Sequence, residues 1–174
     1  MRIACLQSNV SREQATRMCQ TPLRQLRHGR LRLILDFYVP YHFYRLESSE
    51  HSNLLMAIDA VTGRLDPYQF SGVPQTDQIE TRHFISIQIG EKESLRSLEE
   101  KRLRMAMMNG FFKLSDQTVS WQFVACLHLP YWIGIYERHG RAHLEIVEAL
   151  RGRFEGAKMR DLVAGWFENT KQTN

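Results

Sequence analysis

Residues 39–45 read VPYHFYR and residues 129–137 read LPYWIGIYE, and the likeness of these two stretches decides the fold that we expect. The likeness continues downstream, where residues 58–66 read IDAVTGRLD and residues 147–155 read VEALRGRFE. The spacing also agrees, because the proline precedes the motif glycine by 23 residues in the first copy and by 22 in the second. Similar segments repeated at a matching spacing predict an internal duplication.

The stretches upstream of the two copies share an order of predicted elements but not the same residues. Residues 2–6 form a short apolar run before a helix that opens at Ser11, and residues 84–89 form one before a helix that opens near Glu93 or Ser94. Each unit then reads as strand, helix, strand, strand and short strand. The sequence therefore predicts an α+β fold with antiparallel sheets, in which a β-α-β-β-β unit is duplicated.

The two units are expected to cover residues 1–75 and 76–174 and to pack as one compact domain. The polar residues 71–80 are the expected connection between them. An amphipathic helix over residues 156–169 ends the second unit. In the first unit, Pro22 is expected to end or kink the helix, because proline removes a helix hydrogen bond.

Two prolines lie inside runs that otherwise read as strands. Because proline has no amide donor, Pro40 and Pro130 are each expected at an edge, a bulge or a sharp bend. Residues 137–142 predict a hairpin turn that contains Gly140. Residues 47–53 predict a looser turn at the corresponding place in the first unit.

Positive charge is concentrated near the start of the chain. The net charge is only +4, but residues 1–32 carry seven arginines against one acidic residue, Glu13. Such a segment can meet phosphates or acidic lipid headgroups, or it can be the solvated side of a helix. The balance of 43% hydrophobic and 24% charged residues is that of a folded protein with a substantial core.

The cysteines and the N-terminal residues bear on the compartment. Cys5, Cys19 and Cys126 are too few and too scattered for a disulfide framework or a four-ligand zinc site. The first residues turn polar too soon for a signal peptide, and no run of about 18 apolar residues is present. We therefore expect reduced thiols, no transmembrane segment and a cytoplasmic location.

The motif DAVTGRL at residues 59–65 resembles the closing signature of PepSY-like domains, in which a hairpin strand ends in an Asp-x-x-Thr-Gly turn followed by an apolar residue. The second copy keeps only Glu148, Gly152 and Phe154 of this pattern. The resemblance implies a small α+β module associated with protease inhibition or with binding and regulation, and not a catalyst. Alternatively, the aspartate and glycine of the first copy simply make a turn.

Histidine and cysteine spacings suggest two kinds of site. His139 and His143 have the spacing of two metal ligands on one helix face, but Gly140 between them indicates a turn, so we expect no metal site. Cys126 and His128 fall on the same strand face. There they form either an activated nucleophile or an ordinary pair of packed neighbours.

Two carboxylates occupy equivalent places in the units. Asp59 and Glu148 could meet as an acid/base pair, but each also precedes a glycine by four residues and can simply accept the amides of a turn. The chain contains none of the motifs GxxxxGK[ST], GxGxxG, GxSxG or HExxH. We therefore expect no catalytic residue and no cofactor, although a site built from scattered residues stays open.

Aromatic residues near the two prolines are the better functional lead. Most should be core, but those on the second strand face could form a groove for a peptide, a small apolar ligand or a second copy of the chain. The leading hypothesis is a noncatalytic binding or regulatory module of unknown ligand, with a homodimer as one expected form of assembly. The candidate ligand-binding residues are Tyr41, His42, Tyr44, Tyr131, Trp132 and Tyr136. The alternative, which is weaker, is nucleic-acid or anion binding through Arg24, Arg27 and Arg30.

Overall fold

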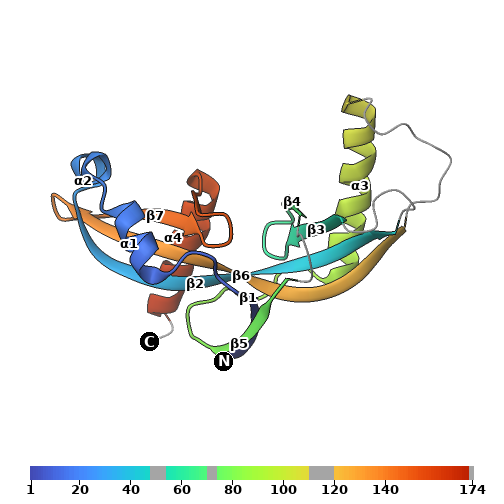
Figure 1. The fold of residues 1–174 in the computed structure, drawn as a ribbon, viewed down its shortest axis with the longest axis horizontal. Helices are drawn as coiled ribbons and strands as arrows, with labels where there is room; N and C mark the ends of the chain where they lie inside the picture. The colour runs from blue at the N-terminus through green and yellow to red at the C-terminus, as the bar shows by residue number, and fades with distance from the viewer. Residues whose placement is uncertain (48–53, 70–73, 110–119, 173–174) are drawn as a thin grey trace.

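The computed structural model describes residues 1–47, 54–69, 74–109 and 120–172, which form an α+β fold (Figure 1). In the described residues, four helices accompany an eight-stranded mixed sheet. In chain order the elements are β1 (Arg2–Leu6), α1 (Arg12–Cys19), α2 (Pro22–His28), β2 (Arg30–Glu47), β3 (Leu54–Asp59), β4 (Leu65–Gln69), β5 (Thr76–Glu80), α3 (Glu91–Asn109), β6 (Ser120–Arg138), β7 (Arg141–Glu148), β8 (Arg153–Phe154) and α4 (Ala157–Gln172).

Two long antiparallel strands, β2 and β6, run side by side through the whole molecule, and the other strands and helices lie on or beside them (Figure 1). The strand order is β4-β3-β2-β6-β1-β5, while β7 pairs with another part of β6 and β8 pairs with β7. One lobe in Figure 1 carries α1, α2, β7 and α4, and the other carries α3, β3 and β4. None of the helices in the described part of the chain has the length and apolar character needed to cross a bilayer.

The two motif prolines lie in the middle of these central strands, so an edge position and a bulge are both wrong for them, while the third expectation, a sharp bend, stays a prediction. Pro40 pairs with His128, and Pro130 pairs with Tyr38, in a continuous register. The irregularities in this register lie elsewhere, near the two ends of β2.

The position of Pro40 is explained by a change of neighbour along β2. Tyr38 exchanges backbone hydrogen bonds with residues 83–85, whereas the Pro40 carbonyl accepts from Ala60, just beyond β3. The proline nitrogen faces the junction between these two neighbours, where no amide donor is needed. The same occurs on β6, where the neighbour changes from β1 to the end of β7 at Pro130.

The two motif turns make matching hydrogen bonds. The amide of Val61 donates to Asp59 Oδ1 over 2.8 Å, and the amide of Leu150 donates to Glu148 Oε1 over 2.9 Å. The glycine that closes each turn has a positive φ, 68° in the first and 64° in the second. Both carboxylates are thus turn acceptors, as one of the two interpretations predicts. The duplication itself stays a prediction that these parallels support.

Two expectations about strands are wrong. Residues 84–89 form no strand, and only Phe84 makes an isolated bridge, to Tyr38. Instead, the expected connection contains β5, which pairs antiparallel with β1 at the edge of the sheet. Its sequence TDQIE is mostly exposed, so it is held mainly by main-chain pairing with β1. Hydrophobic patterning cannot reveal a strand of this kind.

The remaining boundaries agree more closely with expectation. α1 ends before Pro22, which then begins α2 in its first turn. α3 begins at Glu91, a little earlier than expected, and α4 extends to Gln172. The hairpin turn between Arg138 and Arg141 is confirmed. Of the looser turn expected at residues 47–53, all but the first residue lie outside the described residues.

The core lies around the middle of β2 and β6. Its buried members include Phe37, Val39, Phe43, Leu129 and Ile133. Helix α4 closes one side, with Met159 and Val163 in this cluster and the Trp166 ring edge-on to Phe37, 5.1 Å between centroids. The core therefore sits under the two motif tyrosines and positions them.

Candidate functional site

A pocket of about 310 Å³ opens where both halves of the chain meet over the centre of the sheet. Its volume is within the range of small-molecule sites, about 300–1,000 Å³. The walls come from β2, β6, the turn after β3, α3 and α4. The lining residues are Tyr41, Asp59, Thr62, Gly63, Arg64, Asp66, Lys101, Tyr131, Glu155, Lys158, Met159 and Leu162.

The buried end of the pocket is formed by two tyrosines at equivalent motif positions. Tyr41 and Tyr131 are 3% and 2% exposed, and their hydroxyl oxygens lie 3.1 Å apart in a hydrogen bond. Burial, and next the negative charge of Asp59, raise the pKa of Tyr41 far above its usual value. A neutral hydroxyl at physiological pH is suited to hydrogen bonding and not to proton abstraction.

All three carboxylates of the pocket are already engaged. Asp59 accepts from the Thr62 hydroxyl over 2.6 Å as well as from turn amides. Asp66 receives two parallel hydrogen bonds from the Arg151 guanidinium, over 3.0 and 2.9 Å. Glu155 lies 3.5 Å from the Arg153 guanidinium. All three carboxylates are therefore hydrogen bonded or ion paired within the protein, although Arg151 and Arg153 also contact the buried Glu148.

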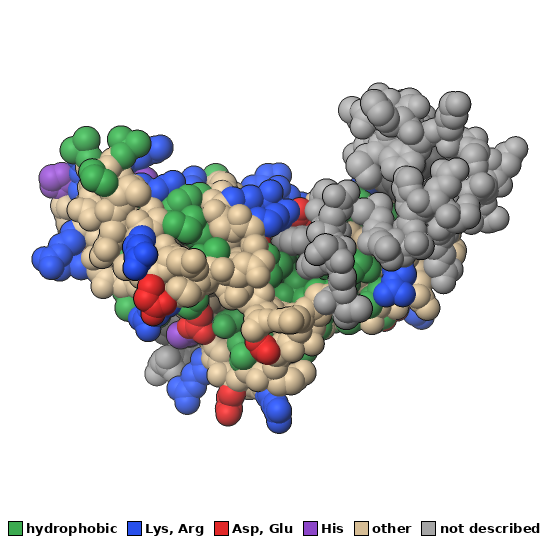
Figure 2. Space-filling model, viewed as in Figure 1, with side chains coloured by type: hydrophobic (Ala, Val, Ile, Leu, Met, Phe, Trp, Pro, Cys, Tyr) green, Lys and Arg blue, Asp and Glu red, His purple; other side chains and the backbone are tan. Residues whose placement is uncertain are grey.

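The cations of the lining are less fully engaged. Arg64 and Lys158 are exposed, and within the described residues their side chains make no hydrogen bond or ion pair. The ammonium of Lys101 donates to the carbonyl of Gly63. In Figure 2, Lys and Arg side chains gather in the middle of the face shown, between the two lobes. Arg64 and Lys158 are thus the lining cations with which a ligand can pair.

The other four predicted ligand-binding residues join strands to neighbouring segments. Tyr44 and Tyr136 are fully buried, and their hydroxyls donate to backbone carbonyls of α3 and α1 over 2.8 and 2.7 Å. His42 is buried against Ser94, 2.7 Å from its hydroxyl, and burial lowers its pKa. Trp132 donates to the Val10 carbonyl over 2.7 Å. These side chains form core contacts rather than an exposed groove.

The three predicted anion-binding arginines are not equivalent in the structure. Arg24 pairs with Glu145, and its guanidinium lies 3.3 Å from the centroid of the Phe154 ring. Arg27 and Arg30 are exposed. The structure therefore separates one arginine that is part of the packing from two that face solvent.

The predicted cysteine-histidine pair has separate environments. Burial raises the pKa of the Cys126 thiol, which disfavours the thiolate needed for nucleophilic attack. His128 Nδ1 lies 3.2 Å from the carbonyl oxygen of Ala4, and burial lowers its pKa. Among the residues that the structure describes, no three His, Cys, Asp or Glu side chains are grouped to hold a metal ion.

Sequence reasoning missed the cations and most of the acidic residues of the pocket. Arg64 and Asp66 directly follow the glycine of the first motif, so the repeated motif could have indicated them. Lys158 lies at the start of α4, and nothing in the sequence places that helix beside the motif turn.

No family model, curated protein or solved structure matches this chain. The resemblance to PepSY-like domains therefore stays a prediction based on the turn motif.

Proposed function

We propose that the protein is a noncatalytic binding module that holds a small organic anion in the pocket between its halves. One observation carries this proposal: the pocket combines engaged carboxylates with two exposed cations, Arg64 and Lys158, that make no ion pair with the described residues. An anionic group would complete the hydrogen bonding of these cations. At its buried end, the Tyr41–Tyr131 pair would meet the uncharged part of the ligand.

The charged lining favours such a ligand over the small apolar ligand or peptide expected from the sequence. A purely apolar ligand would remove Arg64 and Lys158 from water without giving them a partner, which is unfavourable. A carboxylate or phosphate would instead form charge-assisted hydrogen bonds with the same groups. The pocket volume of about 310 Å³ suits a molecule of metabolite size.

The proposal of binding without catalysis rests on the state of the titratable groups. Tyr41 keeps its proton, Asp59 and Asp66 are held by internal donors, and Glu155 is paired with an arginine. A neutral Tyr41 does not act as a base at neutral pH. Binding is what such an arrangement supports best.

Native mass spectrometry of protein purified at low salt tests this proposal. The expected spectrum shows a co-purified small anion, or an adduct when citrate is added, that weakens in the double variant Arg64→Gln/Lys158→Gln. The matched control is Arg82→Gln, an exposed arginine outside the pocket. Equal citrate adducts in all three proteins would overturn the proposal. The same spectrum reports the mass of the assembly, which tests the homodimer expected from the sequence.

A further inference from the structure

Helix α2 has its polar side turned inward and its apolar side turned outward. Arg24 and His28, one turn apart on the same helix face, both contact the buried Glu145, which lies 3.3 Å from His28 Nε2. Leu23 and Leu26, also neighbours on the helix surface, are each 75% exposed. A helix that only packs against its own protein normally buries its apolar residues and exposes the polar ones.

The exposed leucines lie at one end of the molecule. Helix α2 sits at the tip of the lobe that also carries α1 and β7 (Figure 1). Apolar side chains project from this tip in Figure 2, beside Lys or Arg and His side chains.

Arginines surround the leucines on the same tip. Arg27 and Arg30 are exposed, and so are Arg138 and Arg141 in the turn between β6 and β7. Arg138 donates to the carbonyl of Arg27 over 2.7 Å, which joins this turn to α2.

The acidic residues near the tip are already paired. Glu145 is paired with Arg24, and Glu137 lies 2.9 Å from the Arg32 guanidinium. The four arginines of the tip are therefore not neutralised by these two carboxylates, and the tip is positive as well as apolar.

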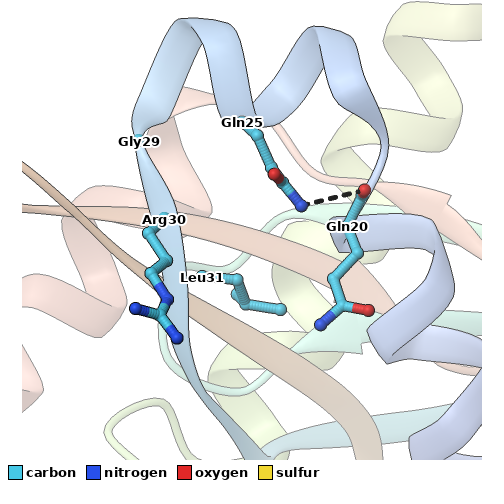
Figure 3. A pocket seen from close by; sticks show the side chains of 5 residues that line it. All are labelled: Gln20, Gln25, Gly29, Arg30 and Leu31. Carbon is cyan, nitrogen blue, oxygen red and sulfur yellow. Dashed lines mark hydrogen bonds between the residues drawn. The ribbon is translucent and has the colours of Figure 1, made fainter.

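A polar hollow of about 490 Å³ opens directly beside α2. It is lined by Gln20, Gln25, Gly29, Arg30 and Leu31, and the Gln25 side-chain amide donates to the Gln20 carbonyl over 3.1 Å. Figure 3 shows the Arg30 guanidinium and the Gln20 side-chain amide on opposite sides of Leu31. These donors lie beside the helix that carries the exposed leucines.

We propose that α2 and the β6–β7 turn dock on the surface of a lipid bilayer that contains anionic lipid. Leu23 and Leu26 enter the boundary between headgroups and acyl chains, while Arg27, Arg30 and the two arginines of the turn contact the headgroups. This surface site is separate from the pocket between the two halves.

Charge and shape favour a bilayer over other partners. A protein interface buries about 1,200–2,000 Å² of fitted surface, whereas a bilayer requires only projecting apolar residues and neighbouring cations. Nucleic acid would contact the arginines but would gain nothing from Leu23 and Leu26 at the tip.

Co-sedimentation with lipid vesicles tests the proposal. The full chain is mixed with vesicles of phosphatidylcholine alone and of phosphatidylcholine with phosphatidylserine, at low and high salt. Wild-type protein should bind the second kind, and less at high salt. Leu23→Ser/Leu26→Ser should lower the partition coefficient by about tenfold, and Arg27→Gln/Arg30→Gln by about fivefold for each arginine.

The matched control is Ile87→Ser/Arg82→Gln, which removes an exposed apolar side chain and an exposed arginine elsewhere on the surface. It should bind as the wild type does. Absence of vesicle binding by the wild type would overturn the proposal. Binding that depends on Arg27 and Arg30 but not on Leu23 and Leu26 would also overturn the proposal. That result would show that the arginines attract anions in general, nucleic acid included.

Discussion

The hydroxyl oxygens of Tyr41 and Tyr131 lie 3.1 Å apart, although ninety residues of chain separate them. Each tyrosine directly follows a motif proline, one on β2 and the other on β6. The antiparallel pairing of these strands brings the two motifs together at the centre of the sheet. This contact therefore joins the two halves of the chain and also forms the buried end of the pocket.

Removal of this hydrogen bond should cost stability. Tyr41→Phe and Tyr131→Phe are each expected to lower the free energy of unfolding by about 1 kcal/mol, because each removes this buried hydrogen bond. The double variant should lose less than the sum of the two, with a coupling of about 0.5–1.5 kcal/mol. Urea unfolding of the four proteins measures this. Strictly additive losses would show that the hydroxyls do not interact.

The turn after β3 should depend on Asp59. Asp59→Ala removes the acceptor for the Val61 and Thr62 amides and is expected to cost about 2–3 kcal/mol, since the carboxylate is 2% exposed. Asp59→Asn keeps one side-chain oxygen and should cost clearly less. Chemical unfolding measures the loss of unfolding free energy in both variants. An Asp59→Ala variant as stable as the wild type would mean that the turn does not need an acceptor there.

Parts of the fold follow from local chemistry and were predictable from sequence. The Asp59 and Glu148 turns are of this kind, because an acceptor and a nearby glycine determine them within a few residues. The roles of Pro40 and Pro130 were not predictable in this way. They depend on β1 and residues 83–85 lying beside strands of the other half of the chain.

The same limit applies to the candidate sites. Tyr41 and Tyr131 were among the aromatic residues predicted near the two motif prolines, and the pairing of β2 with β6 brings them together. Lys158 lines the pocket because of where α4 packs, and no local sequence pattern predicts that position. Leu23 and Leu26 would be predicted as core from their spacing, and only the Glu145 contacts of α2 turn them outward.

Gly29 should be required where α2 passes into β2. Its φ is 90°, and an added Cβ would clash with the carbonyl oxygen of Glu137 and lie 2.7 Å from Arg138 Cβ. Gly29→Ala is therefore expected to lower the thermal unfolding midpoint and to cost at least about 2 kcal/mol. Gly165→Ala is the control, since it meets no atom within 4 Å and should stabilise α4 by up to about 1 kcal/mol. A Gly29→Ala variant as stable as the wild type would contradict the close contact described between the end of α2 and β6.

Stability should fall in mildly acidic solution. Burial lowers the pKa of His28, His42 and His128 in the folded protein below the ordinary value of 6.5. Below about pH 6.5 the unfolded chain therefore binds more protons than the folded protein does. The stability that the neutral histidines contribute is complete above about pH 6.5 and is lost as the pH falls toward the folded pKa values. His42→Gln should reduce the slope of unfolding free energy against pH by up to about 1.4 kcal/mol per pH unit. An unchanged slope in urea unfolding would show that His42 does not contribute.

The central claim is that the pocket between the two halves binds a small anion, and isothermal titration of citrate tests it most directly. The account predicts saturable binding to the wild type, and binding at least about tenfold weaker when Arg64 and Lys158 are both replaced by glutamine. Arg82→Gln should bind as the wild type does. Identical affinity in all three proteins, or no heat of binding in the wild type at any salt concentration, would contradict the claim.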